Sequence, residues 1–141
     1  MVCIYCGKDT KVTNSREKVR LPSTWRRRRC NSCIAQFSTI ELPNFATSLV
    51  VTNKNGALSP FSRDKLFISI YKALGHRDDA TQSASGLIPT VISTLLRKYP
   101  IQDGSVSAHH IALSAYIVLK RFDPMSAHTY KAYHKTLLDK K

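Results

Sequence analysis

The sequence predicts an α+β protein with two small domains, and three observations lead to this. All four cysteines lie within the first 33 residues, where turn residues are frequent and no long helical period occurs. An Asn-Gly pair between two short apolar runs follows, which is typical of a β-hairpin. After it, apolar residues recur at helical spacing between capping residues. We therefore expect a small cysteine-bearing domain at residues 1–45 and a mainly helical domain, one hairpin with about four helices, at residues 46–141.

The charge balance is strongly basic. Lys and Arg number 22 against 9 Asp and Glu, which gives a formal net charge of +13. Such a surface attracts phosphate polyanions and anionic ligands, although a basic protein without such a partner remains an alternative. The longest mostly apolar stretch, "IALSAYIVL", is too short to span a bilayer, and no signal-peptide pattern opens the chain. We expect a soluble, cytoplasmic protein without a membrane partner.

The cysteines form two C-x-x-C pairs, Cys3/Cys6 and Cys30/Cys33, with 23 residues between them. Two such turns deliver four thiolates to one tetrahedral Zn²⁺. A thioredoxin-like redox pair is disfavoured because no βαβ pattern surrounds either pair. A [2Fe–2S] site is not excluded by spacing. Four thiolates leave no open coordination position, so the zinc is expected to be structural. Gly7 suits a close approach to sulfur, whereas Ile34 lacks that backbone freedom.

Four consecutive arginines, Arg26–Arg29, lead directly into Cys30. In an extended strand alternate guanidinium groups point to opposite faces. Arginine bonds phosphate oxygens or guanine edges in bidentate fashion. The C-x-x-C turn that begins at Cys30, here called the second knuckle, would hold the end of this run in place. We interpret this run as a nucleic-acid contact, with a solvated positive strand as the alternative.

The predicted second domain follows a joint near Pro43. A hairpin is expected at about Leu49–Leu58, with Asn55 and Gly56 at positive-φ turn positions. Pro89 makes the start of the second helix uncertain and could confine its regular part to the residues after the proline. The expected helices run from the N-cap Ser62 to Gly75, through the "LIPTVISTLLRKY" region, from Ser107 to about Phe122, and from Asp123-Pro124 to about Leu138.

Cations surround the start of the helix that follows Ser62. Lys54 in the hairpin turn and Arg63 and Lys65 in the first helical turn, together with free backbone N–H groups, favour a phosphate site. Neither of the two common glycine-rich phosphate loops is present, and no Mg²⁺-binding carboxylate cluster is evident. A nucleotide hydrolase is therefore the less favoured hypothesis, and no enzyme is predicted. His109, His110, His128 and His134 are expected to be ordinary surface residues.

Two stretches resemble known families. "VTNKNGALSPFSRDKLFISIYKAL" resembles the opening of an ATP-cone, a small nucleotide-sensing domain of ribonucleotide reductases. "CIYCGKDTKVTNSRE" with "RRRRCNSCIAQFSTIE" resembles the zinc ribbon of the NrdR family of bacterial transcriptional repressors. In this order the two stretches resemble that family over nearly the whole chain.

This resemblance implies a repressor that binds promoter DNA of ribonucleotide reductase genes through its zinc ribbon. ATP or dATP in the ATP-cone would control the homo-oligomeric state and thereby DNA affinity. The alternative is an interaction protein that binds RNA or another protein. The residues implied are the zinc ligands Cys3, Cys6, Cys30 and Cys33, the DNA contacts Arg16, Arg26, Arg27, Arg28 and Arg29, and the nucleotide contacts Val51, Asn53, Lys54, Ser62 and Lys65.

Overall fold

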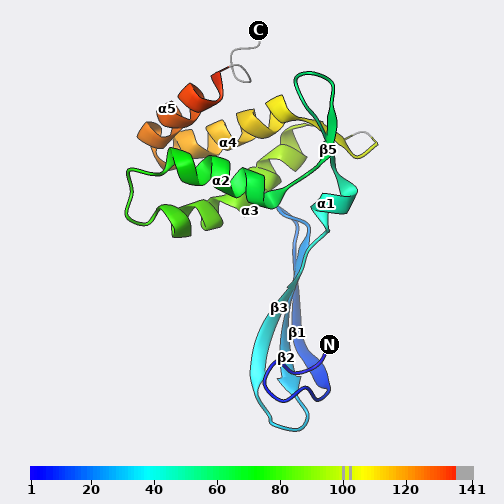
Figure 1. The fold of residues 1–141 in the computed structure, drawn as a ribbon. Helices are drawn as coiled ribbons and strands as arrows, with labels where there is room; N and C mark the ends of the chain where they lie inside the picture. The colour runs from blue at the N-terminus through cyan, green and yellow to red at the C-terminus, as the bar shows by residue number, and fades with distance from the viewer. Residues whose placement is uncertain (100, 102, 136–141) are drawn as a thin grey trace. The chain divides into compact units, whose positions relative to one another are not determined.

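The computed structural model describes residues 1–99, 101 and 103–135, and it confirms the predicted α+β class (Figure 1). The chain divides into two compact units, Met1–Pro43 and Asn44–Lys141. The first unit is built from strands, and the second combines a small sheet with helices. Within the described residues, no helix has the length and apolar character needed to cross a bilayer.

The first unit is a three-stranded antiparallel sheet in the order β1-β2-β3. The strands are β1 (Thr10–Lys18), β2 (Ser23–Cys30) and β3 (Gln36–Glu41). A register shift between Val12 and Asn14 makes a bulge in β1. Only Cys3 and Cys30 are buried in this fully described unit, each with 2% of its surface exposed. The unit therefore has almost no hydrophobic core of its own.

The second unit begins with the short helix α1 (Phe45–Ser48) and contains a second three-stranded sheet. Its strands are β4 (Val50–Thr52), β5 (Leu58–Pro60) and β6 (Ser105–Ser107), in the order β5-β4-β6. Strands β4 and β5 form the expected hairpin, and β6 pairs with β4 in parallel. Sequence analysis did not anticipate α1 or β6, because a three-residue strand paired far along the chain leaves no local signal.

The described part of the second unit also contains four longer helices: α2 (Arg63–Ala73), α3 (Ala80–Lys98), α4 (Ala108–Phe122) and α5 (Pro124–Tyr133). Helix α2 packs on α3 and α5, and α4 packs on the same two helices. The core lies between them, with Ile70, Leu95 and Leu119 almost fully buried. The predicted N-caps are confirmed: Ser62, Ser107 and Asp123 accept hydrogen bonds from backbone N–H groups in the first turns of α2, α4 and α5. The predicted end of the last helix near Leu138 lies outside the described residues.

Two predicted details of this unit are wrong. Helix α3 begins at Ala80 and continues through Pro89. Pro89 and Ser85 are both on the exposed side, so water can satisfy the Ser85 carbonyl that the proline leaves without its helical partner. The hairpin turn is also longer than a two-residue turn: Asn53 N–H donates to the Ala57 carbonyl at 2.8 Å. Only Gly56 in this turn has a positive φ, and the Asn55 side chain instead accepts from Ala57 N–H.

Candidate functional site

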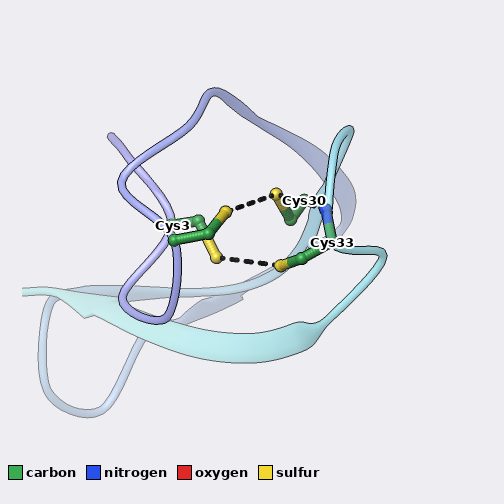
Figure 2. Close-up of side chains that lie close together, drawn as sticks. Cys3, Cys30 and Cys33 are labelled. Carbon is green, nitrogen blue, oxygen red and sulfur yellow. Dashed lines mark hydrogen bonds between the residues drawn. The ribbon is translucent and has the colours of Figure 1, made fainter.

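The four cysteine thiols of the first unit converge on one point. Their sulfur atoms all lie within 4.8 Å of one another. Two contacts join the cysteine pairs: Cys3 Sγ lies 3.6 Å from Cys33 Sγ, a contact drawn in Figure 2, and Cys6 Sγ lies 3.5 Å from Cys30 Sγ. A tetrahedral Zn²⁺ with Zn–S bonds of about 2.3 Å separates its sulfurs by about 3.8 Å. These contacts are far longer than a disulfide bond, so the four thiols fit one zinc ion.

The backbone of the second knuckle, Cys30–Cys33, favours the thiolate form of Cys30. The backbone N–H of Cys33 donates to Cys30 Sγ at 3.4 Å, and the N–H of Ser32 donates at 3.3 Å. The Cys33 N–H has the largest influence, and together these bonds lower the pKa of the Cys30 thiol to about 6 although burial opposes them. Because the thiolate is the form that ligates zinc, these bonds favour Cys30 as a ligand. The pKa of Cys33 is instead raised to about 12: an Ala35 backbone hydrogen bond lowers it, but hydrogen bonds with neighbouring thiols, Cys6 foremost, together with burial raise it more. Zinc must therefore displace the Cys33 proton.

Each knuckle ends in a residue with left-handed backbone geometry. Gly7 after Cys6 has φ +70°, and Ile34 after Cys33 has φ +64°. The expectation for Ile34 was wrong, because the chain forces this β-branched residue into the same conformation as the glycine. For such a residue this conformation is strained by about 1–2 kcal/mol. A Cβ added to Gly7 would meet no atom within 4 Å, so its φ is what favours glycine there.

The two faces of the first sheet differ in charge. Residues that alternate along a strand share a face with their cross-strand partners. One face, here called the cationic face, carries the arginine opposite Trp25, the two exposed arginines of β2 and lysines paired with β2. It contains no Asp or Glu in any of the three strands. The cations of the cationic face are Lys11, Arg16, Lys18, Arg27 and Arg29.

The opposite face, here called the neutral face, holds the other two arginines with two glutamates, Glu17 and Glu41. Arg26 forms a 3.1 Å ion pair with Glu41. Arg28 donates to Thr39 Oγ1 at 3.4 Å and to Thr10 Oγ1 at 3.5 Å. These partners occupy both guanidinium groups. The four arginines therefore divide into two pairs on opposite faces, as predicted for an extended strand, and the two pairs have different surroundings.

Trp25 lies in the middle of the cationic face. It is half-buried, and the Arg16 guanidinium carbon lies 5.9 Å from the ring centroid. This cation–π contact holds Arg16 on the same face as Arg27 and Arg29 without using a carboxylate. Sequence analysis missed Lys11 and Lys18 as members of this face. Alternation from Arg16 could have found Lys18, whereas Lys11 joins the face only through the bulge between Val12 and Asn14.

The second unit contains a cavity of about 290 Å³ between the β4–β5 hairpin and helices α2, α4 and α5. Apolar groups provide much of the lining, including Val51, Phe61 and Ile111. Among the described residues that line it, Lys65 is the only cation and none is a carboxylate. The polar lining residues are Asn53, Ser59, Ser62, Lys65, Ser69 and His134.

Four of the five predicted nucleotide contacts therefore line one cavity: Val51, Asn53, Ser62 and Lys65. The fifth, Lys54, lies exposed in the hairpin turn outside this lining. Sequence analysis did not single out Ser59, Ser69 or His134 for this site. The expectation that His134 is an ordinary surface residue was wrong, because it is half-buried beside Tyr130.

We predict that Cys33→Ser abolishes stoichiometric zinc binding and unfolds the first unit, because three thiolates no longer close the site. Metal analysis should give one zinc ion per wild-type chain, and fluorescence of the single tryptophan should report the unfolding. The helical circular dichroism of the second unit should persist. Ser32→Ala lies between the same two cysteines and should keep its zinc. Full zinc content in Cys33→Ser would contradict the proposed ligand set.

We predict that Ile34→Gly stabilises the zinc-loaded first unit by about 1 kcal/mol, because glycine adopts a positive φ without strain. Urea unfolding followed by Trp25 fluorescence measures this change. Ile4→Gly is the matched control, since Ile4 is an exposed apolar residue of the other knuckle without a positive φ. Equal or lower stability of Ile34→Gly would show that the left-handed geometry costs nothing here.

Comparisons with known proteins agree with these features. A family model described as "Transcriptional repressor NrdR-like, N-terminal domain" matches residues 1–41. The chain is 31% identical over 99% of its length to the transcriptional repressor NrdR of Bordetella avium (strain 197N), covering 85% of that protein. It is 32% identical over 100% of its length to NrdR of Pelagibacter ubique (strain HTCC1062), covering 90%. It is 33% identical over 96% of its length to NrdR of Maricaulis maris (strain MCS10), covering 84%. Likeness over both units shows that the chain belongs to the NrdR family of transcriptional repressors.

Proposed function

We propose that this chain is a nucleotide-responsive repressor that binds promoter DNA of ribonucleotide reductase genes. The first unit would contact the duplex, and an adenine nucleotide in the second unit would control self-assembly and so DNA affinity. The NrdR family consists of repressors and not of enzymes. The observation that carries the DNA-binding part is the cationic face, where five cations share one side of a sheet without a carboxylate.

The cationic face suits a duplex for two physical reasons. Arg27 and Arg29 are exposed, and neither forms a side-chain ion pair within this fully described unit. Their guanidinium groups can therefore bond phosphate oxygens or guanine edges in bidentate fashion. Both arginines also lie on the central strand of a sheet rather than on a loop, so little backbone conformational freedom is lost on binding. Most of this contact would be electrostatic and so would weaken with salt.

The cavity supports the nucleotide part of the proposal. Its apolar lining suits a purine ring, and Lys65 with the start of α2 suits phosphate. Ser62 caps this helix while lining the cavity, so the first free N–H groups of α2 lie at the same end as Lys65. Zinc would act only as a structural clamp in the first unit.

Control by a nucleotide requires a difference in affinity. A nucleotide shifts an assembly equilibrium only as far as it binds one assembly more tightly than another. One small sheet gives a weak grip on DNA, and several copies on repeated sites would add avidity. The proposed effector therefore changes DNA binding through the number of sheets that engage a promoter together.

The direct test is DNA binding to ribonucleotide reductase promoter fragments with ATP, with dATP or with neither, while particle size is measured in parallel. We expect nucleotide-dependent size and nucleotide-dependent DNA affinity in the zinc-loaded chain. Lys65→Ala should lose the nucleotide response and retain its zinc, and Lys120→Ala, an exposed lysine of α4, should retain both. DNA affinity identical under all three conditions would contradict the proposal. Equal binding to structured RNA would favour a general nucleic-acid interaction protein.

The two sheet faces give a sharper prediction. Arg27→Ala and Arg29→Ala should each weaken DNA binding and reduce the log–log salt slope by about one, the value for one lost phosphate contact. Arg26→Ala and Arg28→Ala remove side chains that already have protein partners on the neutral face, so they should change the slope little. Electrophoretic or fluorescence titrations at several salt concentrations measure both. The opposite order of effects would place the DNA on the neutral face.

A further inference from the structure

The nucleotide cavity opens beside a second hollow between α2 and α5. This groove, of about 680 Å³, is lined by Lys65, Ile68, Ser69, Lys72, Tyr133 and His134. Lys65, Ser69 and His134 line both spaces and so mark a junction between them. Lys72 lines only the groove, which therefore adds a second cation on the same helix. No carboxylate lines either space among the described residues.

This distribution of charge favours one orientation of an elongated anionic ligand in the two hollows. Among the described residues, the lining of the cavity is mostly apolar with one cation, whereas the lining of the groove has two cations. A nucleoside triphosphate has an apolar ring at one end and several negative charges at the other. Its ring therefore fits the cavity, and its phosphates fit the junction with the groove, where Lys65 lies on the path and Lys72 lies beyond it.

His134 occupies this junction in a defined orientation. Its Nε2 lies 2.7 Å from Ser69 Oγ, and its ring lies 4.4 Å from the Tyr130 ring. Tyr130 is almost fully buried, so these two contacts hold the imidazole against α2 and α5. Burial lowers the pKa of His134, and the ring is therefore neutral near pH 7 in the ligand-free protein.

The described residues that share these hollows with His134 include cations and no carboxylate. Lys65 and Lys72 of α2 line the groove with it. Its own helix adds Tyr130 and Tyr133, with the exposed Lys135 next in the chain. Around the same cavity, α4 contributes Ala108, Ile111 and Ala112, and the hairpin contributes no titratable side chain.

We propose that His134 is a phosphate ligand of the nucleotide site and takes up a proton when the nucleotide binds. This inference rests on the proposed binding of an adenine nucleotide in the cavity. The proton comes from solvent. In the resulting imidazolium both ring nitrogens carry N–H, so Nε2 donates to Ser69 Oγ and Nδ1 is left to donate to a phosphate oxygen. Such a charge-assisted bond is stronger than one from the neutral ring.

The direction of the pH effect follows from linkage. Phosphates between Lys65 and His134 favour the charged imidazole and so raise its pKa in the complex. A ligand that binds the protonated form more tightly gains affinity as pH falls through that pKa. Triphosphate binding should therefore strengthen between about pH 8 and about pH 6, the range in which histidine titrates. Adenosine has no phosphate and should show no such gain.

Isothermal titration calorimetry on the zinc-loaded full chain tests this inference. ATP affinity in the wild type should rise at least about fivefold more between about pH 8 and about pH 6 than in His134→Gln, a typical size for a coupling between sites. Glutamine keeps a hydrogen bond to Ser69 but cannot titrate. Because the terminal phosphate of ATP also titrates near pH 6, the diagnostic quantity is the difference between the two proteins.

Matched controls separate this role from general surface charge. His128→Gln changes an exposed histidine on the same helix and should retain the wild-type pH dependence. Lys72→Ala should weaken ATP binding and leave adenosine binding unchanged, whereas Lys120→Ala should change neither. An equal pH dependence in wild type and His134→Gln would overturn the inference while leaving nucleotide binding intact. Absence of ATP and adenosine binding at every pH would instead overturn the proposed nucleotide function and this inference with it.

A second measurement uses only the wild-type protein and so does not depend on the folding of a variant. Proton NMR of the wild type resolves the imidazole resonances of its five histidines. One imidazole should titrate at higher pH after ATP is added, and adenosine should leave all five unchanged. If ATP raises the pKa of none of them, His134 takes up no proton and the inference is wrong.

Discussion

The tetrathiolate cluster is the constraint on which the first unit depends. Only Cys3 and Cys30 are buried there, so apolar burial contributes little to its folding. Structural zinc supplies about 10–16 kcal/mol in small zinc-binding modules. That free energy offsets the chain entropy of ordering three strands, and it also offsets the strain of holding Ile34 in left-handed geometry. A sheet with so little core is free to present polar and charged groups on both faces.

The same cluster determines which arginines face outward. Cys30 is the last residue of β2, and its side chain must point to the metal from the neutral face. Because side chains alternate along a strand, Arg28 and Arg26 share that face, and Arg29 and Arg27 take the other. A slip of one residue would exchange the two pairs. The cysteine cluster therefore determines which arginines lie on the cationic face and also stabilises the fold.

Local chemistry in the sequence was enough to predict the four-cysteine cluster, the hairpin and three helix starts, because cysteine spacing and capping residues act over a few positions. Strand β6, the continuation of α3 through Pro89 and the geometry of Ile34 depend on tertiary context instead. Pro89 is tolerated because it faces solvent while Ile88 and Val91 remain buried. The cavity was predicted in part: its hairpin and α2 residues follow a recognisable pattern, whereas Ser69 and His134 meet only when α2 and α5 pack together.

Both units are positively charged, so copies of the chain repel one another through both of them. The first unit carries nine basic and three acidic residues, and the remainder carries thirteen and six, so charges of +6 and +7 sum to +13. Bringing such chains together is opposed by their like charge. Under the proposed function, a nucleotide in the cavity and a duplex on the cationic face would both add negative charge, so either ligand would lower this opposition. By reciprocity, a nucleotide that favours the DNA-bound assembly must itself bind more tightly when DNA is present. The electrostatic part of this coupling is screened by salt, since the charges on the cationic face are exposed.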